Sequence, residues 1–184
     1  SREEQDAFSL QSQQRMSKAM EEGRFEEQIV PIHVPIRKGE PIEFKVDEHP
    51  RPETSKEGLA KLPAVFLKDG TVTAGSSSGL NDAASVVVIM SREKANQLGI
   101  TPLAVVRAQA VAGVDPNIMG IGPVPATQKV LEKAGLALAD MDVIEINEAF
   151  ASQVLACDKE LKMDPLKVNV NGGAIAHGHP LGAT

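Results

Sequence analysis

From residue 83 onward, short apolar runs alternate with helical periods. Residues 83–90 are apolar on both faces apart from Ser85, which is typical of a central strand in a sheet covered on both sides. Residues 103–111, 143–146 and 168–170 also read as strands. Helices are expected between them, at residues 91–98, around Thr127, Val130, Leu131 and Ala134, and along the stripe Phe150, Val154, Cys157 and Leu161. Because strands and helices that alternate over short connections form layers, the sequence predicts an α/β protein with a layered sheet.

The first 75 residues follow a different pattern. Ser1 and Glu4 form a capping-box sequence before a run of strong helix formers, and Gly23 is a natural stop, so residues 1–22 are predicted to be one helix. The side chains expected to pack on a neighbour are Phe8, Met16, Ala19 and Met20. Residues 29–34 and 42–46 are predicted to pair as edge strands of a hairpin, followed by a short helix that ends near Leu62.

Composition excludes several classes of function. The 184 residues are 42% hydrophobic, which is ample for a packed core, and carry a formal charge of −6, which makes nucleic acid a poor partner. No apolar run reaches the roughly 20 residues that span a bilayer, and the first residues lack the pattern of a signal peptide. A single cysteine, Cys157, excludes an intrachain disulfide and fits a reducing compartment. A cytoplasmic location is expected.

A glycine loop near the C-terminal end carries two histidines. Gly172 and Gly173 follow the predicted strand 168–170, and His177 and His179 come directly after them. Such loops commonly carry function. The chain ends at Thr184 inside this loop without a polar tail, so we expect it to belong to a larger protein.

Two polar side chains follow predicted strands where α/β proteins place their ligands. Asn147 comes directly after residues 143–146, and His179 lies beyond residues 168–170. Brought together, the amide and the imidazole would stabilise an oxyanion, one of them through a water, which suits acyl transfer. The alternative is that Asn147 caps a helix or turn and that His179 only fixes its loop.

Other candidates for chemistry are weaker. His177 and His179 share a face of an extended chain, but two ligands are too few for a closed metal site, so no metal is expected. Cys157 lies in the middle of a helix stripe and is expected to be a buried structural thiol rather than a nucleophile. The small residues 74–79 allow a ligand to approach the backbone but lack the lysine of a phosphate loop.

Four motifs occur in the order found in one enzyme family. They are Val72-Thr73-Ala74-Gly75 with Ser78-Gly79-Leu80-Asn81-Asp82, then Met119-Gly120-Ile121-Gly122-Pro123, then Asn147-Glu148-Ala149-Phe150-Ala151, and last Gly172-Gly173-Ala174-Ile175-Ala176 with Gly178-His179-Pro180. Together they resemble the thiolase family along essentially the whole chain. The sequence of residues 168–173 is most similar to that of the biosynthetic branch of the family.

The resemblance implies a fold and a division of the chain. Thiolases have a five-layer α-β-α-β-α fold of two similar halves, with an inserted loop domain that binds coenzyme A, and this chain would be an incomplete part of it. Residues 1–75 then resemble the end of the loop domain, and residues 76–100 resemble the last strand and helix of the N-terminal half. Residues 101–184 resemble most of the C-terminal half, and stop before its second catalytic cysteine.

The resemblance also implies roles for particular residues. His179 matches the family histidine that activates the nucleophilic cysteine, and Asn147 matches the asparagine that holds the oxyanion-hole water. Neither family cysteine has a counterpart in this chain, and Cys157 matches neither motif. The positions that resemble those lining the coenzyme A path and the acyl pocket are Arg51, Leu62, Phe66, Ala74 and Ser78, with Met119 and Phe150 beside the acyl group.

The implied reaction joins two acetyl-CoA molecules into acetoacetyl-CoA and coenzyme A, or runs as the reverse thiolysis. Coenzyme A thioesters are then substrates, no separate cofactor is expected, and the whole protein is expected to be a homodimer or homotetramer in lipid metabolism. A degradative 3-ketoacyl-CoA thiolase is the alternative, and a catalytically inert fragment that binds coenzyme A or other subunits is a third possibility. A thiolase-like synthase or lipid-transfer relative ranks low, because residues 147–150 keep the thiolase motif.

Overall fold

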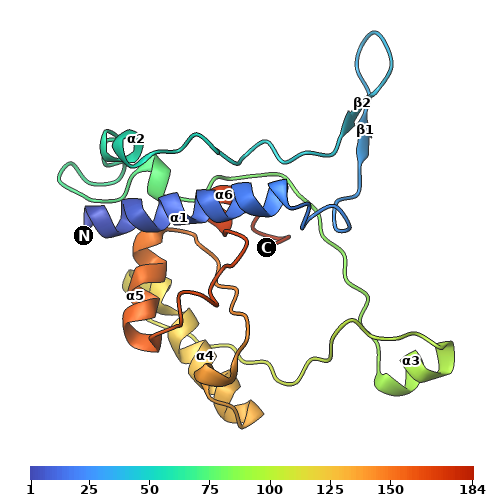
Figure 1. Ribbon diagram of the computed structural model, residues 1–184. Helices are drawn as coiled ribbons and strands as arrows, with labels where there is room; N and C mark the ends of the chain where they lie inside the picture. The colour runs from blue at the N-terminus through green and yellow to red at the C-terminus, as the bar shows by residue number, and fades with distance from the viewer.

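The long N-terminal helix is the element on which the other parts assemble. In this computed structural model, which describes residues 1–184, α1 spans Arg2–Glu21 and lies across the top of the packed body (Figure 1). Ser1 Oγ accepts a hydrogen bond from the Glu4 N–H at 3.2 Å, and Gly23 follows the helix with φ +68°. The predicted capping box and glycine stop are confirmed.

The buried side of α1 is mostly polar, unlike the apolar stripe predicted from the sequence. Met16 and Ala19 are buried, but Phe8 is half-buried and Met20 remains 36% exposed. The other buried residues of the helix are Gln5, Asp6, Ser9, Ser12 and Gln13. These side chains face short elements that bring many backbone polar groups to the helix, so α1 packs through hydrogen bonds as much as through apolar contact.

Four short elements pack against α1. They are α2 (Lys56–Ala60), the 3₁₀ turn η1 (Ala74–Ser76), α5 (Ala151–Leu161) and α6 (Ala174–His177). Arg2 holds α2 against α1, because its guanidinium pairs with Asp6 of α1 at 2.9 Å and donates to the Leu59 carbonyl of α2 at 2.7 Å. The predicted short helix before Leu62 is therefore present as α2 and is held by α1.

The predicted hairpin is confirmed. β1 (Ile32–Val34) and β2 (Ile42–Phe44) pair antiparallel, with Ile32 opposite Phe44. All residues of both strands are exposed, and the hairpin projects away from the rest of the chain (Figure 1).

The predicted helices of the C-terminal part are confirmed. α3 spans Arg92–Leu98 and α4 spans Pro123–Ala134, and each ends at a glycine, Gly99 or Gly135, with φ +67°. The 3₁₀ segments η2 (Pro116–Ile121) and η3 (Leu138–Asp140) flank α4, and α5 packs on both α4 and η2. No helix of the chain is both long enough and apolar enough to cross a membrane.

The predicted central strands are wrong as formed elements. Residues 83–90 and 103–111 run as extended chain without a paired neighbour, and they link a separate α3 to the body (Figure 1). Residues 143–146 and 168–170 form a single parallel β-bridge, between Ile144 and Val168, and no longer ladder. A strand needs a partner for its backbone N–H and C=O groups, and the described residues supply none for the first two runs. The only sheet within the chain is the β1–β2 hairpin.

These unpaired runs leave much apolar surface in water. Val86, Val87, Val88 and Ile89 are 90%, 79%, 81% and 79% exposed, and Leu103, Val106 and Val111 are also exposed. Extended apolar segments with free backbone groups are templates for association with another chain.

We therefore expect the 184-residue chain, prepared alone, to associate in solution. Light scattering should report species larger than a monomer, and Val87→Asp should reduce their fraction because the charge opposes burial of this segment. Thr101→Asp adds the same charge at an exposed position outside both runs and should have little effect. A monodisperse monomer of the unaltered chain would contradict this expectation.

Candidate active site

Asn147 and His179 lie together in the structure. Asn147 follows the Ile144 bridge, and His179 follows α6, where its backbone N–H donates to the Gly79 carbonyl at 2.9 Å. The Asn147 amide Nδ2 lies 3.4 Å from His179 Nε2, and both side chains are accessible to solvent. The meeting of amide and imidazole that the sequence left open is thus present.

Asn81 holds the backbone that carries the histidine. Its Oδ1 accepts from the His179 N–H at 3.3 Å, and its amide occupies the space where a Cβ at Gly178 would lie. Gly178 also has φ +94°, a region that side chains other than glycine rarely adopt. Asn81 belongs to the motif of residues 78–82, but its neighbours in the sequence do not predict this contact with His179.

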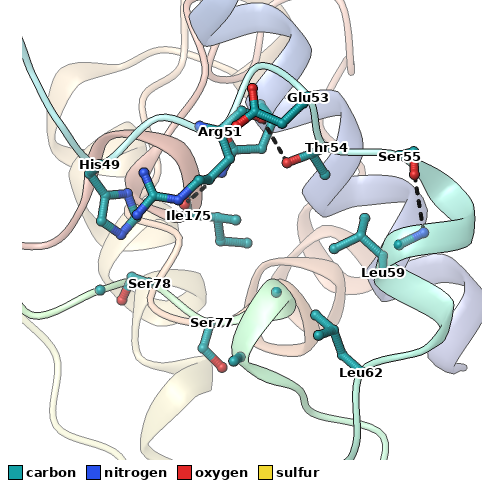
Figure 2. A pocket seen from close by; sticks show the side chains of 15 residues that line it. His49, Arg51, Glu53, Thr54, Ser55, Leu59, Leu62, Ser77, Ser78 and Ile175 are labelled. Atoms are coloured by element: carbon teal, nitrogen blue, oxygen red, sulfur yellow. Dashed lines mark hydrogen bonds between the residues drawn. The ribbon is translucent and has the colours of Figure 1, made fainter.

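A cavity of about 620 Å³, within the size range of small-molecule sites, reaches Gly79 but is lined by neither Asn147 nor His179. His179 lines a second cavity of about 650 Å³, with Asn81 and residues 180–183. The walls of the first cavity come from α1, α2, η1, α6 and the segments beside them (Figure 2). The lining includes four of the predicted coenzyme A positions, Arg51, Leu62, Ala74 and Ser78. Gly79 connects the cavity to the histidine, because Gly79 lines the cavity and its carbonyl accepts from His179.

Figure 2 shows His49 and Arg51 on one wall of the cavity, Ser77 and Ser78 on another, and Leu59 with Leu62 at one end. The Arg51 guanidinium donates to the carbonyls of Glu48 at 2.7 Å and Pro50 at 3.1 Å and remains exposed. It places a positive charge at the rim, where an anionic group can reach it.

His49 connects this wall of the cavity to α6, which precedes His179. Its Nδ1 lies 2.9 Å from the Ala176 carbonyl in α6, and a Cβ at Gly79 would overlap its ring. The absence of a side chain at Gly79 therefore lets the histidine ring, the cavity wall and the His179 backbone meet.

The three remaining predicted positions lie outside the cavity lining. Phe66 and Phe150 contact each other edge to face with ring centroids 5.7 Å apart, and Phe150 bridges to the lining residue Ser77. Met119, in η2, is 74% exposed. The structure thus joins Phe66 and Phe150 to the cavity wall but does not bring Met119 to it.

Cys157 is buried in α5, as the sequence predicted. Its Sγ donates to the Gly120 carbonyl at 3.3 Å, and burial raises the pKa of the thiol, against a smaller lowering by the Gln153 amide. A protonated, enclosed thiol is a poor nucleophile.

His177 points to a different environment from His179. Its Nε2 lies 3.1 Å from the Asn171 carbonyl, and its ring packs edge to face on Phe25. Burial raises the pKa of the nearby Glu145 carboxyl. The charge of His177 lowers this pKa, and the charge of Glu148 raises it. No group of three His, Cys, Asp or Glu side chains lies close enough to hold a metal ion.

Comparison with known proteins identifies the family. Residues 1–93 match the family model described as thiolase, N-terminal domain, and residues 100–184 match the model described as thiolase, C-terminal domain. The chain therefore belongs to the thiolase family.

Individual relatives agree with the family models. An acetyl-CoA acetyltransferase of Chromobacterium violaceum is 57% identical over 183 residues, which are 100% of this chain and 47% of that protein. The crystal structure of the Bacillus anthracis acetyl-CoA acetyltransferase superposes with a TM-score of 0.98 at 53% identity, over 100% of this chain and 46% of that one. The crystal structure of human mitochondrial 3-ketoacyl-CoA thiolase in complex with CoA superposes with a TM-score of 0.87 at 49% identity, over 98% of this chain and 44% of that one. The fold is that of thiolases, and the chain spans about half the length of the curated relatives it matches.

We expect the Cys157 thiol to resist modification in the folded chain. Its sulfur is enclosed and its pKa is raised, so its reaction with a thiol reagent at pH 8 should be slow and should become rapid in denaturant. Gln153→Ala, which removes the amide that lowers this pKa, should slow the reaction further. Rapid modification of the native chain would contradict the buried placement.

Proposed function

We propose that the protein carrying this chain is an acetyl-CoA acetyltransferase, an acyltransferase of the thiolase family. The observation that carries the proposal is the 3.4 Å contact between Asn147 Nδ2 and His179 Nε2, whose loop is hydrogen-bonded to Gly79 in the wall of the 620 Å³ cavity. The relatives named acetyl-CoA acetyltransferase support the choice of reaction.

The geometry around His179 suits a general base. Nδ1 lies 2.9 Å from Thr184 Oγ1, and the Asn147 amide donates toward Nε2, an arrangement that favours a neutral ring protonated at Nδ1. In the reaction the Asn147 amide turns from Nε2 to the oxyanion-hole water, and the electron pair at Nε2 takes the proton of a cysteine thiol. That cysteine has no counterpart here, because Cys157 is buried away from the pair.

Once protonated, the same nitrogen becomes a hydrogen-bond donor. The thiolate attacks the thioester carbonyl, and Nε2–H together with a water held by the Asn147 amide stabilises the oxyanion. The C–S bond to coenzyme A breaks, and coenzyme A takes the proton from Nε2 and leaves as the thiol. The α-carbon of a second acetyl-CoA loses a proton to the second family cysteine, which this chain does not contain, and attacks the acetyl carbonyl. The bond from that carbonyl to the cysteine sulfur then breaks, which releases acetoacetyl-CoA and restores the thiolate. Thiolysis is the reverse sequence.

The cavity is proposed to hold coenzyme A. Arg51 at the rim attracts the phosphates of the nucleotide, while Leu62 and Ala74 contact the pantetheine and Ser78 offers a hydroxyl. The Phe66 and Phe150 pair would border the acyl end. This local cationic and apolar surface explains how a chain with a net charge of −6 binds an anion.

The proposal also covers the assembly, location, cofactor need and domain division of the whole protein. The family resemblance implies a cytoplasmic homodimer or homotetramer in lipid metabolism, no cofactor besides the thioester substrates, and the division at residues 75 and 100. The 184-residue chain alone would be catalytically inert. A degradative 3-ketoacyl-CoA thiolase remains the alternative, and activity on long 3-ketoacyl chains without activity on acetoacetyl-CoA would favour it.

Removal of either member of the pair should lower turnover in the full-length gene product. In thiolysis of acetoacetyl-CoA, His179→Ala should lower kcat by about 1,000-fold and Asn147→Ala by about 100-fold, because one removes a base and donor and the other a water ligand. His177→Ala, a matched histidine change outside the pair, should lower kcat less than about 3-fold. Equal losses at His177 and His179 would contradict the assignment.

Arg51 should contribute to substrate affinity rather than to chemistry. Arg51→Ala should raise KM for acetoacetyl-CoA by about 10-fold with kcat nearly unchanged, since a charge-assisted phosphate contact is lost. Added salt should raise the KM of the unaltered protein more than that of the variant. Arg37→Ala, which removes an exposed cation on the hairpin, serves as the control. A normal KM for Arg51→Ala would exclude a role for Arg51 in binding.

A further inference from the structure

Asn169 is a buried side chain that brackets Asn147 on both sides. It is 1% exposed, and its carboxamide bonds to both residues that flank Asn147. Oδ1 accepts from the Ile146 N–H at 2.9 Å, and Nδ2 donates to the Ile146 carbonyl at 2.9 Å and to Glu148 Oε1 at 2.8 Å. The Asn147 side chain is exposed, and its amide contacts His179 Nε2 at 3.4 Å.

Glu148 extends this bracket to the loop that carries His179. Its carboxylate is 1% exposed and forms no ion pair. Oε2 accepts from Ser12 Oγ at 2.7 Å and from the Ile175 N–H of α6 at 3.2 Å, and Ser12 Oγ accepts in turn from the Gly173 N–H at 3.0 Å. A continuous set of hydrogen bonds thus runs from both neighbours of Asn147 to the start of α6.

The surrounding backbone is adapted to this network. A Cβ at Gly173 would overlap the Glu148 carboxyl carbon, so only glycine lets the two segments come this close. Asn169 itself has φ +43°, which asparagine tolerates better than most residues.

Burial of this carboxylate is costly for stability alone. A carboxylate removed from water without a cation needs every oxygen hydrogen-bonded, and well-packed apolar groups are often at least as stable. Apolar packing does not fix the relative orientation of two segments. Hydrogen bonds do, because each one constrains both a distance and an angle between the segments it joins.

We infer that Asn169 is a positioning residue for Asn147 and that, with Glu148, it sets the separation of Asn147 from His179. The inference deepens the proposed function and rests on it. Loss of the bracket would let the peptide at residues 146–148 rotate and would misplace the Asn147 amide. Turnover would then fall while the cavity, and therefore KM, stays nearly the same.

The test is a double-mutant cycle on thiolysis of acetoacetyl-CoA by the full-length gene product. Asn169→Asp keeps the size and the tolerance of positive φ, but it loses both Nδ2 donors and sets a second carboxylate against Glu148. Alone it should lower kcat by about 10-fold with KM within about 2-fold, since displacements near 1 Å at a reacting group have effects of this order or more. In the Asn147→Ala background the same change should lower kcat less than about 2-fold, because its effect passes through Asn147.

A second change reverses one hydrogen bond and tests the contact itself. Glu148→Gln in the Asn169→Asp background places an amide donor opposite the new carboxylate, so part of the lost kcat should return. Asn171→Asp makes the same substitution two residues away, at a side chain that bonds Arg24 instead, and should leave kcat unchanged. Should Asn169→Asp fail to fold, Ser12→Ala interrupts the same network at its far end and enters the cycle in its place.

The outcomes separate this inference from the proposed function. Suppose that Asn147→Ala lowers kcat, and that Asn169→Asp lowers kcat by the same factor in the Asn147→Ala background as in the unaltered protein. The inference is then overturned and the proposed function stands. If Asn147→Ala has no effect on kcat, the proposed site fails and the inference fails with it. A tenfold loss at Asn169 that vanishes with Asn147, together with partial rescue by Glu148→Gln, establishes the positioning role.

Discussion

The structure depends on hydrogen bonds made by the buried polar side of α1. Ser12 contacts both Glu148 and the Gly173 N–H, and Gln13 joins the Ile175 carbonyl to the Arg51 N–H. Three of these four bonds connect residues that are more than a hundred positions apart in the sequence, while only 24 of 184 residues are buried. With so small a core, directional bonds rather than apolar packing fix how the cavity wall, α6 and the Asn147 segment lie.

That arrangement joins two tasks at one place. The cavity is connected to the Asn147–His179 pair by a backbone hydrogen bond, because Gly79 lines the cavity and its carbonyl accepts from the His179 N–H. His49 adds a second connection through the Ala176 carbonyl. The cavity wall and the loop that orients the histidine are therefore joined through Gly79 and through Ile175 of α6.

Local rules predicted the helices well and the strands poorly. The Ser1 cap, the glycine ends at Gly99 and Gly135, and the hairpin all depend on a few neighbouring residues, so the sequence shows them directly. Residues 83–90 have strand character, but a strand forms only against a partner, and none is supplied within the described chain. The apolar stripe expected on α1 is confirmed at Met16 and Ala19 but not at Met20, which stays exposed. The rest of the buried side of α1 is polar, because the elements that meet it present polar groups.

The candidate site shows the same division. The sequence by itself determined which residue types stand at the ends of apolar runs, and the motifs that contain Asn147 and His179 are sufficient to identify the family. Only the tertiary structure decided that Asn147 meets His179, that Met119 lies away from the cavity, and that Asn169, Glu148 and Asn81 hold the site together. The physical reason is that hydrogen bonds between distant segments depend on distances and angles in space, and sequence spacing does not contain them.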